Sequence, residues 1–172
     1  MEYLKNCDAI SEEKINLFRE CFILNIDNYL NYKRTNLVKT IENLNYEEIH
    51  PLVNDLLKPE DIVLFSWIHV KPNSKISVHS DIGNWNWSLV IPIQNFLNTT
   101  AEIYTSTEDP SAAQSDEVSY FKYNEDKISL LESLPIVKPF FMNNMVPHTM
   151  RNDNPDFSFY ISIRLDKNFM HG

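Results

Sequence analysis

Hydrophobic residues follow a helical period near the start of the chain. The apolar positions within residues 11–34 that recur every three to four residues are Ile15, Phe18, Phe22 and Ile26. This spacing predicts an amphipathic helix over residues 11–34, with Ser11 as its N-cap and acidic residues in its first turn. We expect a second short helix after Thr35 and a third over residues 50–57, which a Pro in its first turn permits.

From residue 61 onward the apolar positions alternate instead, which is typical of β-strands. The strands that we expect cover residues 62–70, 75–78, 87–93, 102–105, 118–123, 136–142, 146–150 and 157–165. Many short strands separated by turns predict a jelly-roll or cupin-like β-sandwich. We therefore expect a single domain over residues 1–172, mainly β with N-terminal helices. In it residues 1–60 support a β core over residues 61–167.

One stretch of the β part has no apolar pattern. Residues 106–117 are small, polar and acidic, so we expect a long surface loop. Loops of this length in small domains are often lids or substrate-binding elements. We expect this loop beside the mouth of the sandwich, and more mobile than the strands.

Composition and charge narrow the classes of function. The 172 residues carry a net charge of −9 without a basic patch, which argues against nucleic-acid binding. No apolar stretch is long enough for a membrane helix, and no charged-then-apolar leader follows Met1. The two cysteines, Cys7 and Cys21, could pair, but two cysteines do not resemble a disulfide framework, and a reducing compartment is the simpler interpretation. We expect a cytoplasmic protein that is not associated with a membrane.

Candidate metal chemistry begins at His79. His79 and Asp81 lie two residues apart at the end of an expected strand, so their side chains share one face. An imidazole and a carboxylate placed in this way can take two adjacent positions on one metal ion. His148, which follows Pro147 on a later strand, is the candidate third ligand. Two histidines and one carboxylate form the facial triad of non-haem Fe(II) oxygenases, which leaves open positions on the metal.

Each of these residues also has a purely structural interpretation. His79 could be a surface or core histidine near a strand end, and Asp81 could be a solvated turn residue. A lone histidine on an apolar strand, such as His148, is often a satisfied core residue. The metal interpretation therefore depends on the three residues meeting at one point.

The combined pattern of Pro-x-Ser-x-Ile-x-x-His79-x-Asp81, the following Leu-Val-Ile-Pro-Ile strand and the distant His148 with a later arginine resembles the 2-oxoglutarate/Fe(II)-dependent dioxygenases. Within that superfamily it is most similar to the aspartyl/asparaginyl β-hydroxylase-type branch, over roughly residues 62–166. The resemblance implies a double-stranded β-helix with Fe(II), 2-oxoglutarate and O₂. It also implies hydroxylation of an amino-acid-like small molecule or a protein side chain, with succinate and CO₂ as co-products.

The resemblance also implies an arginine that holds the far carboxylate of 2-oxoglutarate. In the most similar branch it usually lies about ten residues beyond the distal histidine, where this chain has Ser158. Arg164 has a spacing seen in other branches of the superfamily, and its planar fork suits a carboxylate. Arg151 is the rival candidate, because it is closer to His148 in the sequence.

Strand alternation assigns faces to the residues around Arg164. Ser158, Tyr160, Ser162 and Arg164 share one face of the last strand, and Phe157, Phe159, Ile161 and Ile163 share the other. Ser162 could add a hydroxyl donor beside the Arg164 guanidinium, and the Tyr104 phenol could also bind the cosubstrate. Trp85 and Asn86 follow Asp81 closely enough to form part of the pocket wall. Each residue also has a structural interpretation: the polar face with Arg164 could be an exposed strand face, and Tyr104 could be a half-buried aromatic residue.

Two alternatives to a dioxygenase stay open. One is a non-catalytic binding or sensor module of the same fold, which the missing arginine at position 158 favours. The other is a cupin-type metal enzyme that does not use 2-oxoglutarate and has no need of Arg164. The sequence does not select among amino acids, peptides, lipids and other metabolites as substrate, and it does not predict the oligomeric state.

Overall fold

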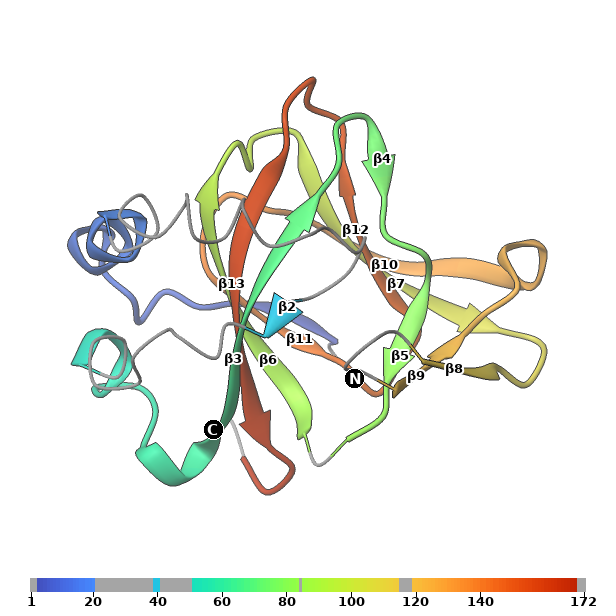
Figure 1. Ribbon diagram of the computed structural model, residues 1–172, viewed down its shortest axis with the longest axis horizontal. Helices are drawn as coiled ribbons and strands as arrows, with labels where there is room; N and C mark the ends of the chain where they lie inside the picture. Colours follow the sequence, from blue (N-terminus) through green and yellow to red (C-terminus); the bar gives the residue numbers. More distant parts are fainter. Residues whose placement is uncertain (1–2, 21–38, 41–50, 84, 115–118, 170–172) are drawn as a thin grey trace.

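The computed structural model describes residues 3–20, 39–40, 51–83, 85–114 and 119–169. Two antiparallel sheets dominate it (Figure 1). The first sheet contains β1 (Leu4–Asn6), β11 (Phe140–Asn143), β6 (Trp85–Gln94), β13 (Ser158–Asp166), β3 (Ile62–Val70) and β2 (Lys39–Thr40), in that spatial order. The second contains β10 (Ile128–Pro135), β7 (Thr99–Ser106), β12 (His148–Asn152), β5 (His79–Asp81), β9 (Ser119–Lys122) and β8 (Ser111–Gln114). The short β4 (Ser74–Lys75) pairs with β12.

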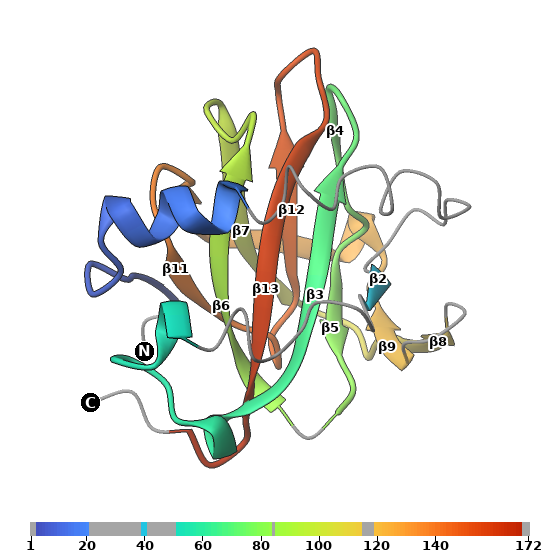
Figure 2. The same cartoon turned by 60° about the vertical axis from the view of Figure 1, so that its left-hand side comes forward.

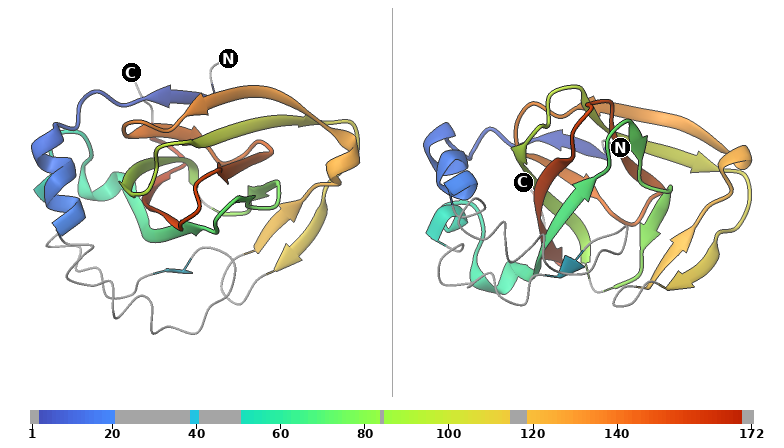
Figure 3. Two further views of the ribbon diagram at one scale, coloured as in Figure 1. Left: turned by 90° about the horizontal axis from the view of Figure 1, so that it is seen from above. Right: turned by 45° about the horizontal axis from the view of Figure 1, so that its top comes forward.

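The chain crosses between the sheets as it proceeds. β3, β6, β11 and β13 lie in the first sheet, and β5, β7, β10 and β12 lie in the facing one. Viewed from above, the strands form two facing layers (Figure 3, left). This arrangement is the double-stranded β-helix that the sequence predicts, and that prediction is confirmed.

The alternation of β13 divides its side chains between two hydrophobic clusters. Phe159, Ile161 and Ile163 point out of the sandwich, where they pack among residues of the N-terminal segment. Tyr160 points between the sheets and packs with Ile103 of β7. The faces assigned from the sequence are therefore confirmed for β13. Arg164 lies on the inner face, where it lines a cavity between the sheets.

Helical residues cover the outer face of the first sheet (Figure 2). Residues 12–20 are helical, and the Ser11 hydroxyl caps them by accepting a hydrogen bond from the Lys14 amide at 3.3 Å. Ile15 and Phe18 are buried in the cluster that includes Phe159. These residues pack on the outer face of the first sheet, whereas the role of residues 1–60 as a support stays a prediction. The expected continuation of the helix through residue 34 lies outside the described residues.

The other two expected helices are described only in part. Residues 51–53 are helical and are followed by a turn, with Val53 and Leu57 buried against the outer face of the sheet. Of the region after Thr35, where a short helix was expected, the structure describes only β2. This segment is a strand that pairs with β3. Across the described ranges, no helix is both long enough and apolar enough to cross a membrane.

Several strand boundaries differ from those expected. The second strand was expected over residues 75–78. Two short strands lie there instead, β4 before residues 76–78 and β5 after them, and each pairs with β12. The strand expected over residues 136–142 begins only at Phe140. β1 and β10 were not expected at all.

The expected loop over residues 106–117 is the main correction to the fold. β8 lies inside it and pairs with β9, so residues 111–114 form a strand and not part of an irregular loop. β9 in turn pairs with β5, with Asp81 opposite Tyr120. β9 and β8 therefore extend the second sheet from the strand that carries His79 and Asp81, while the mobility expected of residues 106–117 stays a prediction.

Candidate metal centre

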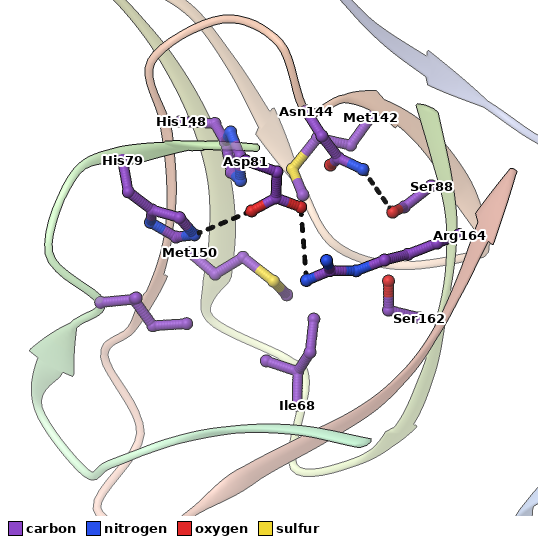
Figure 4. Close-up of a pocket in the computed structure, with 11 residues that line it drawn as sticks. Ile68, His79, Asp81, Ser88, Met142, Asn144, His148, Met150, Ser162 and Arg164 are labelled. Atoms are coloured by element: carbon purple, nitrogen blue, oxygen red, sulfur yellow. Dashed lines mark hydrogen bonds and ion pairs between the residues drawn. The ribbon is translucent and has the colours of Figure 1, made fainter. Parts of the chain in front are cut away.

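Three candidate ligands meet between the two sheets. His79 and Asp81 lie on β5 and His148 lies on the neighbouring β12, directly opposite His79 in the ladder. One potential ligand atom from each residue lies within 4.8 Å of the others, and all three side chains are buried (Figure 4). This spacing would allow all three to bind one ion, as the facial triad requires.

Backbone hydrogen bonds orient both imidazole rings. His79 Nδ1 lies 2.8 Å from the Ser77 carbonyl oxygen, and His148 Nδ1 lies 2.9 Å from the Val146 carbonyl oxygen. A carbonyl oxygen only accepts, so each Nδ1 must carry the proton. Each Nε2 is then left with its lone pair, and this is the tautomer in which a histidine binds a metal through Nε2.

Burial keeps these histidines neutral. Burial lowers the pKa of His79, although the nearby Asp81 carboxylate opposes the shift. Burial, together with the neighbouring His79, lowers the pKa of His148 to about 4. Neutral imidazoles need not lose a proton before they bind a cation, so the pair is suited to metal binding near neutral pH.

Asp81 is held as a carboxylate. Burial opposes its ionisation, but the Arg164 charge and a hydrogen bond from Trp85, joined at low pH by the protonated forms of His148 and His79, outweigh burial and lower its pKa. Its two oxygens have different surroundings. Oδ1 faces His79 Nε2 at 3.8 Å, whereas Oδ2 accepts the Trp85 Nε1 proton at 3.0 Å and lies 3.3 Å from Arg164 Nη2. Oδ1 is therefore the oxygen turned towards the two histidines.

Arg164 reaches the same pocket from the facing sheet. Only 3% of the residue is exposed, and its Nη2 pairs with Asp81. Its Nε and Nη1 are buried and have no hydrogen-bond partner. Leaving charged donors unpaired in the interior is costly, so this guanidinium is suited to an additional anionic partner. Such a partner is what a cosubstrate carboxylate would supply.

A small cavity connects the candidate ligands to Arg164. The residues that line this cavity are Ile68, Ile76, His79, Asp81, Ser88, Met142, Asn144, His148, Met150, Ser162 and Arg164. Ser162 therefore lies in the pocket, as the sequence analysis expected for a cosubstrate-binding residue; whether it binds a cosubstrate stays a prediction. The apolar members come from both sheets and limit the space for water around the polar groups.

Asn144 is a buried pocket residue that the sequence analysis did not single out. Its backbone oxygen accepts a hydrogen bond from the Asp81 amide at 2.9 Å, and its side-chain amide donates to Ser88 Oγ at 2.6 Å. Asn144 thus ties the loop before β12 to β5 and β6. Its position in a polar Asn-Asn segment between two apolar strands was the only sequence feature that could have drawn attention to it.

Two expected cosubstrate residues lie elsewhere. Tyr104 and Arg151 alternate with inward-facing residues of β7 and β12, so their side chains occupy the outer face of the second sheet. There the Tyr104 hydroxyl donates to Glu102 Oε2 at 2.5 Å, and Arg151 Nε lies 3.2 Å from Glu102 Oε1. Neither residue lines the pocket that holds the triad. The structure thus separates them from the site and brings Arg164 to it.

Trp85 and Asn86 also differ from their expected place in the pocket wall, since neither lines the cavity. Trp85 instead contacts two residues of the site, Asp81 and Arg164, from outside the cavity lining. Its Nε1 donates to Asp81, and the Arg164 guanidinium carbon lies 4.6 Å from the centre of its ring.

Comparison with known proteins gives the fold. No protein-family model matches this sequence, and no curated protein matches it. A prolyl-4-hydroxylase from Pseudomonas putida is similar in structure, with a TM-score of 0.50 and 10% identity over 98% of this chain and 95% of the other. AviO1 from Streptomyces viridochromogenes Tue57 has a TM-score of 0.52 and 11% identity over 99% and 92% of the two chains. Both similarities extend over nearly the full length of each chain.

At these identities the similarities indicate a shared architecture and not a shared activity. Neither neighbour's name refers to an aspartyl/asparaginyl β-hydroxylase, so assignment to that branch stays a prediction. The chemistry of this protein depends on the site itself, which combines two imidazole nitrogens, one carboxylate oxygen and a buried arginine.

Proposed function

We propose that this protein is an Fe(II)- and 2-oxoglutarate-dependent dioxygenase that hydroxylates an amino-acid-like small molecule or a protein side chain. One observation carries the proposal. The His79, Asp81 and His148 group shares a buried pocket with Arg164, which has two unpaired guanidinium nitrogens. The group alone would suit many metal enzymes, but the arginine adds a requirement for an anion in the same space.

The donor set fits Fe(II). Imidazole nitrogen and carboxylate oxygen suit a divalent first-row metal, and three protein ligands leave positions for a cosubstrate and O₂. When bound, Fe(II) with 2-oxoglutarate and O₂ supplies the oxidising chemistry, with succinate and CO₂ as co-products. His79, Asp81 and His148 would hold the metal from one sheet.

The facing sheet would hold the other end of the cosubstrate. 2-Oxoglutarate has two carboxylates, and one of them needs a cation away from the metal. Arg164 can provide the unpaired donor nitrogens Nε and Nη1, and Ser162 lies beside it on the same face of β13. Ile68, Met142 and Met150 would exclude water from the methylene carbons between the two carboxylates.

The proposal also includes the chemical class of the substrate, which would enter the pocket from solvent. The chain has a net charge of −9, so an electrostatic attraction to nucleic acid is not expected. We propose a small molecule or a peptide. The prolyl-4-hydroxylase with the same architecture is compatible with either, because its name refers to hydroxylation of an amino-acid residue.

One contact favours a second candidate. Arg164 Nη2 lies 3.3 Å from Asp81 Oδ2, so the arginine could serve as the counter-ion of a metal ligand and not as a clamp. A cupin-type metal enzyme without 2-oxoglutarate, or a non-catalytic binding module, would need no more than that. In both cases the two unpaired nitrogens of Arg164 would have no assigned partner.

The test uses metal-stripped protein that is reloaded with Fe(II) and incubated with 2-oxoglutarate and ascorbate under air. A dioxygenase is expected to release succinate and CO₂, slowly alone and faster with its substrate, which a screen of amino acids and peptides would seek. Calorimetric titration of the Mn(II) form with 2-oxoglutarate measures binding independently of turnover. Binding without succinate would favour the binding module, and metal binding without 2-oxoglutarate binding would favour the cupin-type enzyme.

A further inference from the structure

Trp85 connects two functional side chains that come from different sheets. It is the first residue of β6, and its indole Nε1 donates a hydrogen bond to Asp81 Oδ2 at 3.0 Å. The guanidinium carbon of Arg164 lies 4.6 Å from the centre of the same indole ring. A single residue outside the cavity lining thus contacts both a candidate metal ligand and the candidate carboxylate clamp.

A β-bulge brings the indole to this position. Leu165 pairs with Trp87, whereas Asp166 pairs with Trp85, so Asn86 is an extra residue on β6 at this point. The extra residue interrupts the alternation of faces, and bulges beside active sites commonly re-aim a side chain in this way. Trp87 packs with the outer cluster, while Trp85 reaches Asp81.

Gly83 provides the space that the indole occupies. A Cβ atom at residue 83 would lie 2.4–2.6 Å from three ring atoms of Trp85, which is too close for any contact between carbon atoms. The φ angle of Gly83 is not positive, so backbone conformation does not explain the glycine. The close approach of Trp85 does explain it, and Gly83 is one of only two glycines in the chain.

The hydrogen bond from Trp85 gives the two oxygens of Asp81 different roles. Oδ2 accepts the hydrogen bond from Trp85 Nε1 and forms the ion pair with Arg164 Nη2, so Asp81 contacts both residues through this oxygen. Oδ1 remains for a cation between the two histidines. Partners of this kind fix the orientation of metal ligands, and their loss typically weakens metal binding about 10- to 100-fold.

The indole ring has a separate effect on Arg164. A guanidinium stacked over an indole is attracted to the ring face, and the contact restricts the plane of the fork. Because Nη2 is directed to Asp81, the position of this plane determines where Nε and Nη1 point. Ring and N–H therefore act on different partners and can be tested separately.

A simpler interpretation is that Trp85 only fills space where β6 begins. Under that interpretation, substitutions would lower the stability of the fold without a selective effect on the metal. It does not account for an indole N–H that is bonded to a buried carboxylate or for a ring placed over a buried cation.

We propose that Trp85 is a positioning residue of this site: its N–H orients Asp81 for one-oxygen ligation of the metal, and its ring sets the plane of Arg164. This inference rests on the proposed function. It assigns Gly83 the role of leaving room for the indole.

The test compares metal binding by the wild type with binding by Trp85→Phe, which keeps an aromatic ring and removes the N–H. Co(II) affinity is measured by competition with a chelator, and the Co(II) absorption spectrum reports the ligand arrangement. Trp85→Phe is expected to weaken Co(II) binding about 10-fold or more and to alter the spectrum. Binding of 2-oxoglutarate to protein saturated with Co(II) is expected to change less than about threefold, because the ring stays over Arg164.

Three further variants complete the experiment. Trp85→Leu removes ring and N–H, and it is expected to weaken both Co(II) and 2-oxoglutarate binding. Gly83→Ala displaces an intact indole and should weaken Co(II) binding in the same direction as Trp85→Phe. Trp87→Phe, on the outer face of the same strand, is the matched control and should leave Co(II) affinity unchanged.

The results separate failure of this inference from failure of the proposed function. Wild-type protein that binds no Co(II) would overturn the proposed function and the inference with it. Wild-type affinity and spectrum in Trp85→Phe would overturn the inference alone, even if Gly83→Ala were impaired. Equal losses in Trp85→Phe and Trp87→Phe would also overturn it, since they would indicate a general effect on the fold.

Discussion

His148 lies directly opposite His79 in the ladder between β12 and β5, and the centroids of their imidazole rings are 4.5 Å apart. The two histidines are far apart in the sequence and meet only through this register. A slip of one residue would turn His148 to the outer face of the sheet and separate the pair. The formation of the candidate metal site is therefore a property of strand pairing.

The first prediction concerns metal binding. Wild-type protein is expected to bind one Fe(II), Co(II) or Mn(II) ion per chain. His79→Ala, Asp81→Ala and His148→Ala should each weaken binding about 100-fold or more, because each removes one of three protein ligands. Calorimetry under anaerobic conditions measures the affinity. His69→Asn, which changes a histidine outside the group, is the control, and equal loss in this variant would contradict the assignment.

The second prediction concerns Arg164. Arg164→Ala is expected to raise the KM for 2-oxoglutarate by about one to three orders of magnitude, since a charged paired contact contributes about 1.5–4 kcal/mol. Co(II) affinity should change much less. Initial rates of succinate formation over a range of 2-oxoglutarate concentrations give the KM.

Arg151→Ala is the matched control for Arg164→Ala. Arg151 pairs with Glu102 on the outer face, so its loss is expected to leave the KM within about twofold of the wild type. If Arg151→Ala raised the KM and Arg164→Ala did not, Arg151 would be the clamp and the pocket assignment would be wrong.

The third prediction separates Tyr104 from the cosubstrate. Its hydroxyl donates to Glu102, and burial together with that bond raises the pKa of Tyr104 to about 12. Tyr104→Phe is expected to lower the free energy of unfolding by about 1 kcal/mol and to leave the KM for 2-oxoglutarate unchanged. Urea denaturation and steady-state rates measure the two quantities. A large rise in KM would mean that Tyr104 reaches the cosubstrate.

The fourth prediction is a pH dependence of stability in the metal-free protein. Burial lowers the pKa of both His79 and His148, the latter to about 4, whereas in the unfolded chain each titrates near its ordinary value of about 6.5. Below that value the unfolded chain binds more protons than the folded one. The free energy of unfolding should therefore fall as the pH decreases from about 6.5 to about 4.

Urea denaturation at pH 7.5, 6 and 5, with a chelator present, checks this expectation. The contribution of His148 is on the order of 3 kcal/mol at most, because one pKa unit corresponds to about 1.4 kcal/mol. His148→Gln should make the decline with pH shallower. An equal decline in wild type and variant would show that other groups cause it.

The sequence predicts the fold and the inner face of β13 because apolar alternation survives in most strands. It fails where the ladder is irregular. In β10 the register shifts between Leu130 and Glu132, so the alternation that would identify the strand is broken. Among the strands that the structure describes, β8 pairs only with β9, so Ser111–Gln114 forms an edge strand without a hydrophobic pattern.

The candidate site is predictable to a similar extent. The spacing of His79 and Asp81 and the turn before them, where Asn73 has a φ of 47°, are local features. The role of Trp85 is not predictable from them, because the bulge at Asn86 changes its face. Strand alternation from His148 already predicts that Arg151 points to the opposite face. The face of Tyr104 required the register of β7 with β12, in which its neighbour Ile103 lies opposite His148.

Asp81 and the two histidines belong to one sheet, while Arg164 and Ser162 belong to the other. A dicarboxylate could bind a metal on β5 and β12 with one end and Arg164 on β13 with the other. Such a molecule would link the two sheets. The length of the dicarboxylate would then have to match the distance between the two sheets at the pocket. A shorter or longer diacid could keep both contacts only if the sheets moved, so resistance of the sheets to that movement would determine the selectivity for chain length.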